Sequence, residues 1–178
     1  MDKLILKAEQ IDLTGLDLKM ITKGDTNIMS YHQLETAENI EEILSSENRS
    51  VIILYETQKN IGHWCSIFIR PENPRILEFF DPYGNAPDTQ LKFAVYNKKN
   101  DKPYLSYLLD NWYKRGGKLI YNKFRLQKWD EDVNTCGRWS STRILLRKYS
   151  ISEFSSLFTK NQHYNPDFWV SALTYFDT

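Results

Sequence analysis

Three strand-like segments follow one another between residues 51 and 80, and they constrain the fold more than any other feature of this chain. Val51–Tyr55 is a β-branched and aromatic run of the kind found in buried strands, and His63–Ile69 and Arg75–Phe80 have similar compositions. The turn-forming segment Pro71–Pro74 separates the second strand from the third. This order predicts an antiparallel hairpin at the centre of a sheet.

Helical periodicity predicts the elements around this hairpin. Helices are expected over Leu34–Leu44, Tyr104–Tyr113 and Gly137–Tyr149 and after the capping pair Asn165-Pro166, and short strands over Lys118–Tyr121 and Phe124–Gln127. We therefore expect an α+β fold in which helices flank a central, mostly antiparallel sheet.

The length of 178 residues fits one domain, because one hydrophobic core serves chains of up to about 250 residues. Apolar residues make up 41% of the chain, and no repeat or long linker divides it. We expect a single domain over residues 1–178. The N-terminus lacks the apolar core of a signal peptide, and no run of about 18 apolar residues could span a membrane. The sequence therefore predicts a soluble, intracellular protein with no membrane partner.

The formal net charge is zero, which gives no general attraction to nucleic acid. The basic residues are nevertheless concentrated between residues 92 and 128, where Asp101 and Asp110 are the only acids. They are Lys92, Lys98, Lys99, Lys102, Lys114, Arg115, Lys118, Lys123, Arg125 and Lys128. This segment is interpreted as a solvated basic face, with a polyanion site as the alternative.

Two cysteines occur, and in a reducing compartment both thiols stay free for chemistry. Cys136 lies where a loop is expected to give way to a helix, and a helix N-terminus favours a thiolate nucleophile. Gly137 would let the backbone approach a substrate closely. The alternative is that Cys136 is a small buried residue that opens a helix. Cys65 falls in the middle of a strand and is assigned to packing.

The predicted hairpin brings a base and a carboxylate together. His63 begins one strand and Asp81 follows the next, so the two side chains are expected at the same end of the sheet, as in a catalytic triad. Their alternatives are a histidine satisfied by the backbone and an ordinary Asp-Pro turn. His32 and His163 are the competing bases, but neither lies beside a strand that could pair with one ending in a carboxylate.

A side-chain amide could help to stabilise a reaction intermediate. Gln127 lies nine positions before Cys136, where it could donate to an oxyanion together with the backbone N–H of the cysteine. An exposed glutamine at a strand end is the equal alternative.

Four motifs, in this order, resemble those of adenovirus-type maturation proteases and SUMO-deconjugating proteases, with the closest likeness to virophage and polinton-type proteases. They are Gly62-His63-Trp64, Phe79 to Gly84 with Asp81 inside it, Gln127, and Asn134 to Trp139 with Cys136 inside it. The resemblance spans about residues 28–150. It implies a small domain of the papain-like superfamily with the nucleophile at a helix N-terminus, although papain itself places its cysteine first in the chain.

The resemblance also implies roles. Cys136 would be the nucleophile, His63 the base, Asp81 its orienter and Gln127 the oxyanion donor, although the gap from Gln127 to Cys136 is longer than usual in these families. Trp64 would roof the substrate groove or, equally, be a core tryptophan. No metal or cofactor is implied.

The implied function is a cysteine endopeptidase that cleaves capsid or scaffold proteins after small residues such as glycine, in the virion and in the viral factory of the host cytoplasm. A peptide or DNA activator would fit the adenovirus-type pattern. The alternatives are a protease that removes ubiquitin-like modifiers from host proteins, an acyltransferase with the same residues, and a non-catalytic module that binds nucleic acid or capsid protein.

Overall fold

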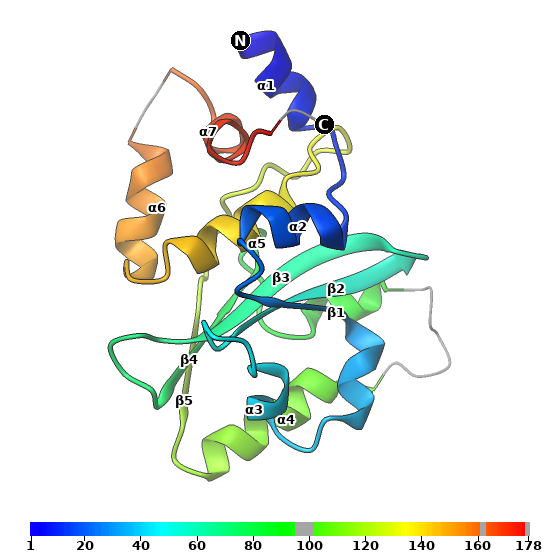
Figure 1. Ribbon diagram of the computed structural model, residues 1–178, viewed down its shortest axis with the longest axis vertical. Helices are drawn as coiled ribbons and strands as arrows, with labels where there is room; N and C mark the ends of the chain where they lie inside the picture. Colours follow the sequence, from blue (N-terminus) through cyan, green and yellow to red (C-terminus); the bar gives the residue numbers. More distant parts are fainter. Residues whose placement is uncertain (95–101, 161–162, 177–178) are drawn as a thin grey trace.

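A five-stranded sheet separates two groups of helices in the computed structural model, which describes residues 1–94, 102–160 and 163–176 (Figure 1). The strands lie in chain order and are β1 (Asn27–Ser30), β2 (Ser50–Gln58), β3 (Ile61–Ile69), β4 (Ile76–Phe80) and β5 (Lys118–Tyr121). The helices are α1 (Asp2–Ala8), α2 (Gly15–Ile21), α3 (Ile40–Ile43), α4 (Tyr104–Lys114), α5 (Cys136–Leu145), α6 (Ile151–Thr159) and α7 (Pro166–Leu173), with 3-10 helices η1 (Tyr31–Thr36) and η2 (Thr89–Lys92).

The predicted hairpin is present, and the sheet around it is mixed. β3 pairs antiparallel with both β2 and β4, whereas β1 is parallel to β2 and β5 is parallel to β4. The expectation of a mostly antiparallel sheet was therefore wrong for the two outer pairings. Each outer strand is reached by a crossover, through η1 and α3 on one side and through α4 on the other, and such connections allow parallel pairing.

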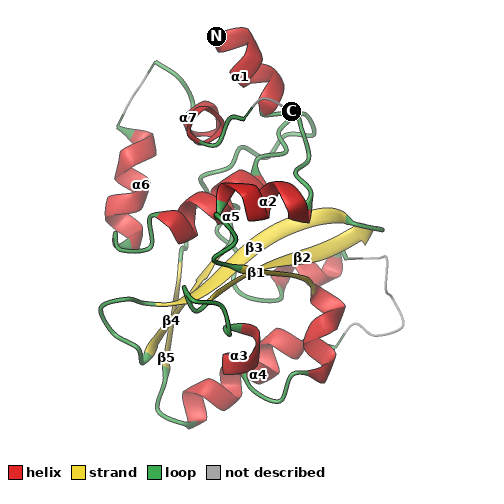
Figure 2. Ribbon diagram, viewed as in Figure 1, coloured by secondary structure: helices red, strands yellow, loops and turns green. Residues whose placement is uncertain are grey.

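The two faces of the sheet carry separate cores (Figure 2). α3 and α4 cover one face, while α2 and α5 cover the other, with α1, α6 and α7 beyond them. Alternate residues of β2 enter the two cores, since Ile53 and Tyr55 face α4, and Ile52 and Leu54 face α2 and α5. A strand buried on both sides explains the continuous apolar run in the sequence.

Several predicted elements differ from the structure. The segment 34–44 is divided between η1 and α3, because Ala37 is extended and the Asn39 side chain accepts from Glu42 N to start a new helix. Residues 124–127 form no strand, and α5 ends at Leu145 rather than at residue 149. The helices at α4 and α7 and the strand at β5 are confirmed.

A buried carboxylate joins α5 to the sheet. Glu78 of β4 accepts hydrogen bonds from Arg143 Nε at 2.6 Å and from Arg70 Nη1 at 2.7 Å, and all three side chains are buried. Breaking such a group leaves a guanidinium charge without its partner in the interior.

Glu78→Gln is therefore expected to lower the free energy of unfolding by about 3–5 kcal/mol in urea denaturation. Glu72 is a matched control, since it also pairs with Arg70 at 2.7 Å but is 57% exposed. Glu72→Gln should cost less than about 1 kcal/mol. Equal losses in the two variants would contradict a structural role for the buried group.

Within the described residues, the helices are too short or too polar to cross a lipid bilayer.

Candidate active site

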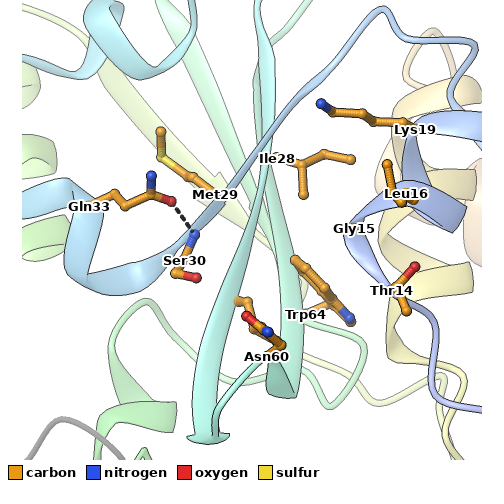
Figure 3. A pocket seen from close by; sticks show the side chains of 11 residues that line it. Thr14, Gly15, Leu16, Lys19, Ile28, Met29, Ser30, Gln33, Asn60 and Trp64 are labelled. Carbon is orange, nitrogen blue, oxygen red and sulfur yellow. Dashed lines mark hydrogen bonds between the residues drawn. The ribbon is translucent and has the colours of Figure 1, made fainter.

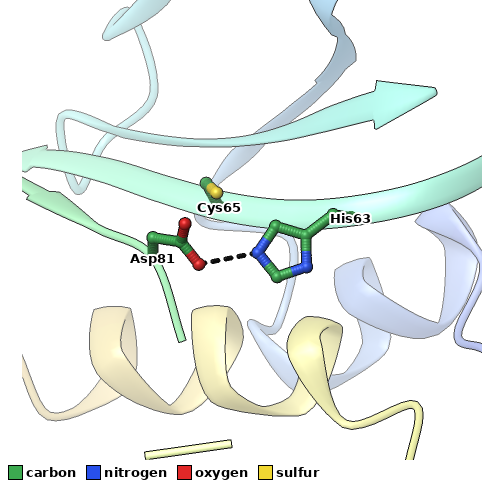
Figure 4. A group of neighbouring side chains, drawn as sticks. All are labelled: His63, Cys65 and Asp81. Carbon is green, nitrogen blue, oxygen red and sulfur yellow. Dashed lines mark hydrogen bonds and ion pairs between the residues drawn. The ribbon is translucent and has the colours of Figure 1, made fainter. Parts of the chain in front are cut away.

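The hairpin places an imidazole against a carboxylate. His63 lies in β3 and Asp81 directly follows β4, and the register that pairs Ser66 with Phe80 brings both to the same end of the sheet. The His63 Nε2 and Asp81 Oδ1 atoms are 2.7 Å apart (Figure 4). The structure thus joins these two predicted residues in a direct hydrogen bond.

Asp81 is fully buried and held from several directions. Its Oδ1 also accepts from Tyr83 N at 2.8 Å, its Oδ2 accepts from Gln90 Nε2 at 3.3 Å, and its backbone N–H donates to Asn122 Oδ1. Burial acts to raise the pKa of Asp81, but the hydrogen bonds and charge of its partners, His63 first, outweigh burial and lower it. The carboxylate therefore stays ionised, so that His63 Nε2 carries the proton and donates.

Cys136 is the third member of the predicted group. It is the first residue of α5, is 7% exposed, and lies close enough to His63 to raise the pKa of the imidazole. Because Nε2 is hydrogen-bonded to Asp81, Nδ1 is the ring nitrogen that remains for a second partner. A thiol, an imidazole and a carboxylate thus lie in the order that nucleophilic catalysis requires.

The environment of His63 favours its charged form. Burial opposes the charge, but the hydrogen bond with the Asp81 carboxylate and the neighbouring Cys136 outweigh burial and raise the pKa of His63 well above its ordinary value. His63 consequently holds a proton at higher pH than a free imidazole does.

Cys65 lies close to this group without being equivalent to Cys136. It is fully buried in the core under α4, and burial, with Asp81 second, raises the pKa of its thiol to about 12. A thiol that stays protonated is a poor nucleophile. Its assignment to packing agrees with this position.

The loop before Cys136 is fixed by residues that sequence reasoning missed. Asp167 of α7 is buried and accepts from Thr135 Oγ1 at 2.5 Å, from Trp139 Nε1 at 2.8 Å and from Lys128 N at 2.8 Å. Burial raises the pKa of Asp167. From the opposite side, Asn134 N donates to the carbonyl of Glu9 at 2.7 Å. The start of α5 is thereby held from both ends of the chain.

Gln127 lies near the site, but its amide hydrogens are already used. The side chain is buried, and Nε2 donates to Val133 O at 2.9 Å and to the Tyr83 hydroxyl oxygen at 3.2 Å. An amide nitrogen has two hydrogens, so both have acceptors. The predicted oxyanion donor thus braces the loop before Cys136 in this structure.

The comparison with known proteins gives a viral relative. No known family profile matches the chain. It is 35% identical over 173 residues to the uncharacterized protein V9 of the Sputnik virophage, and the match covers 93% of this chain and 95% of V9. The chain belongs to the V9 family. A relation to virophage proteins is thereby confirmed, and the name of V9 states no activity.

The two predicted substrate contacts of this V9-family protein, Trp64 and Gly137, also take part in packing. Trp64 is only 6% exposed, and its Nε1 donates to the carbonyl of Leu13 at 3.1 Å. A Cβ at Gly137 would lie 2.9 Å from Leu18 and 3.2 Å from Trp64. The missing side chain of Gly137 therefore lets α5 pack on α2 and Trp64. The indole of Trp64 belongs to the core between the sheet, α2 and α5, and it also lines a hollow at the surface.

Gly137→Ala tests this packing. Alanine is intrinsically better than glycine in a helix by about 1 kcal/mol, but the crowded site should reverse the sign and cost about 1–3 kcal/mol in thermal or urea unfolding. Gly15→Ala in α2, where a Cβ would make an ordinary 3.4 Å contact with Ile28, should be neutral or stabilising. A stabilised Gly137→Ala variant would refute the packing argument.

A hollow of about 430 Å³ lies beside Trp64, between α2 and β1 (Figure 3). Its lining combines apolar and polar side chains. The wall residues include Leu16, Ile28, Met29, Leu54 and Trp64, with Lys19 and Asn60 among the polar ones.

The other residues considered from the sequence lie in separate surroundings. His32 is 52% exposed and pairs with Glu56 at 3.4 Å, and His163 is exposed. Glu78, the acidic residue of β4 that precedes Asp81, is committed to Arg70 and Arg143. Among the described residues, His63, Cys65 and Asp81 place atoms that could bind a metal within 4.8 Å of one another. Two of these atoms, His63 Nε2 and Asp81 Oδ1, are already hydrogen-bonded to each other.

The basic segment is partly neutralised. Its Lys114, Arg115 and Lys128 pair with Asp110, Glu41 and Asp130. Lys98, Lys99 and Asp101 lie outside the described residues.

Proposed function

We propose that this protein is a cysteine endopeptidase with a domain of the papain-like superfamily, and that it cleaves viral capsid or scaffold proteins. The observation that carries the proposal is the 2.7 Å hydrogen bond between His63 Nε2 and Asp81 Oδ1, with Cys136 at the start of α5 near enough to raise the pKa of His63. These are the groups that thiol catalysis needs, in the arrangement it needs.

In the proposed reaction, the sulfur of Cys136 attacks the carbonyl carbon of a peptide bond. His63 takes the thiol proton and gives it to the leaving amine as the tetrahedral intermediate collapses to a thioester. Water then attacks the thioester with His63 as base, and Cys136 is released as the thiol. Asp81 holds the ring so that Nδ1 faces the sulfur throughout.

The surroundings favour a substrate with small residues at the scissile bond. Cys136 is 7% exposed and His63 is 11% exposed, so only a slender chain can reach them. Glycine meets this requirement best, and the hollow beside Trp64 offers room for a larger side chain further along the substrate.

The proposal is tested by incubating the protein with the structural proteins encoded beside it and reading new termini by mass spectrometry. Cleavage next to small residues, absent with the Cys136→Ala protein, is the expected result. Release of a ubiquitin-like modifier from a Gly-Gly linkage instead would show a deconjugating protease, and an acylated but intact target would show an acyltransferase. Identical spectra with both proteins would count against any such chemistry.

A further inference from the structure

We infer that the Tyr83 hydroxyl is a catalytic oxyanion donor, in the role that the sequence assigned to Gln127. This inference rests on the proposed function. When the sulfur of Cys136 bonds to the carbonyl carbon, the π electrons of the C=O bond move to oxygen. The resulting oxyanion needs donors that are already in place.

Tyr83 is fixed to the catalytic group at two points. Its ring stacks on the His63 ring, with centroids 4.6 Å apart and planes inclined by 11°, and its backbone N–H donates to Asp81 Oδ1 at 2.8 Å. The turn that carries Tyr83 is also anchored, because Pro82 O accepts hydrogen bonds from both Leu126 N and Gln127 N. Tyr83 therefore moves with the base and its orienter.

The hydroxyl oxygen of Tyr83 accepts a hydrogen bond, while the hydroxyl hydrogen is available for donation. Gln127 Nε2 donates to the hydroxyl oxygen at 3.2 Å and to Val133 O at 2.9 Å, which fixes the amide orientation. Across residues 1–94, 102–160 and 163–176, no acceptor receives the Tyr83 hydroxyl hydrogen. A hydroxyl whose oxygen accepts a hydrogen bond becomes a stronger donor itself.

The backbone supplies a second donor. The Thr135 hydroxyl, which could cap α5, is instead bonded to Asp167 at 2.5 Å. The N–H of Cys136, the first residue of α5, also has no hydrogen-bond acceptor among the described residues. An N–H at the nucleophile and a hydroxyl on the ring that stacks against its base would together form a two-donor site for an oxyanion.

The electrostatics agree with this placement. Burial is the main cause that raises the pKa of Tyr83 to about 12. The charge of His63 acts to lower this pKa, and the negative charges of Cys136 and Asp81 act to raise it. The hydroxyl therefore keeps its hydrogen at neutral pH and lies within electrostatic reach of the sulfur. It donates a hydrogen bond to the oxyanion without giving up its proton, which leaves all proton transfer to His63.

The test compares two reactions of Cys136 in the Tyr83→Phe protein. Acylation by p-nitrophenyl acetate passes through an oxyanion, whereas alkylation by iodoacetamide does not. Because phenylalanine keeps the ring that stacks on His63, acylation should slow by about 10²–10³-fold while alkylation is unchanged. Tyr113→Phe, on α4 and 71% exposed, is the matched control and should leave both rates unchanged.

The outcomes separate this inference from the proposed function. If the Tyr83→Phe protein acylates at the wild-type rate, the inference is overturned, and a loss in Gln127→Ala alone would return the role to the glutamine. If Tyr83→Phe slows alkylation as much as acylation, the hydroxyl serves the nucleophile and the inference also fails. Should the wild-type protein neither acylate nor alkylate at Cys136, the proposed function falls first.

Discussion

Replacing Cys136 by alanine is expected to abolish proteolysis, down to the background rate of the uncatalysed reaction. The sulfur is the atom that forms the thioester, and Cys65, the other thiol, is held protonated in a core with a pKa of about 12. The measurement is the appearance of new termini in a protein substrate, with folding of the variant checked by circular dichroism.

Cys65→Ala is the control for this substitution. Both variants lose one buried sulfur, so both should lose some stability, but Cys65→Ala should keep the cleavage activity of its folded fraction. Loss of activity in Cys65→Ala, together with activity in Cys136→Ala, would reverse the roles of the two cysteines.

Asp81→Asn is expected to have the next largest effect, a fall in kcat/KM of up to about 10⁴-fold. The carboxylate fixes the proton on His63 Nε2, whereas an amide can turn its NH₂ group toward the ring and favour the wrong tautomer. Burial works against the charge on His63, and the carboxylate is one of the groups that overcome it. Its removal should therefore also lower the pKa of His63.

The pH profile gives this prediction a second readout. Activity should fall at high pH as His63 loses the proton that it must give to the leaving amine. Because the pKa of His63 is raised, this high-pH limb of the activity profile should lie well above the ordinary pKa of histidine. In Asp81→Asn the limb should move to lower pH. An unshifted limb with full activity would show that Asp81 acts only in the turn.

The centre of the fold was predictable because its signals are local. The β-branched run in β2 and the turn before β4 mark the hairpin, and the hairpin alone is enough to bring His63 to Asp81. Cys136 could likewise be placed at a helix start. What the sequence could not show is that β1 and β5 pair in parallel, because that depends on crossovers between distant segments.

Residues whose function depends on tertiary contacts were harder to interpret. Gly137 was expected to face substrate, yet its position against Leu18 depends on how α2 packs over α5. Asp167 carries no local signal for its bonds to Thr135 and Trp139, which are far from it in sequence. The capping box of Ser150 and Glu153 at α6 was a local signal that the periodicity analysis overlooked.

The central claim is that His63 activates Cys136, and a short pulse of iodoacetamide at neutral pH tests it most directly. The alkylated residue is identified by peptide mapping in the wild-type and His63→Ala proteins. The account predicts that Cys136 takes the label much faster in the wild type than in His63→Ala, while Cys65 remains unlabelled in both. Equal labelling of Cys136 in the two proteins, or preferential labelling of Cys65, would contradict it.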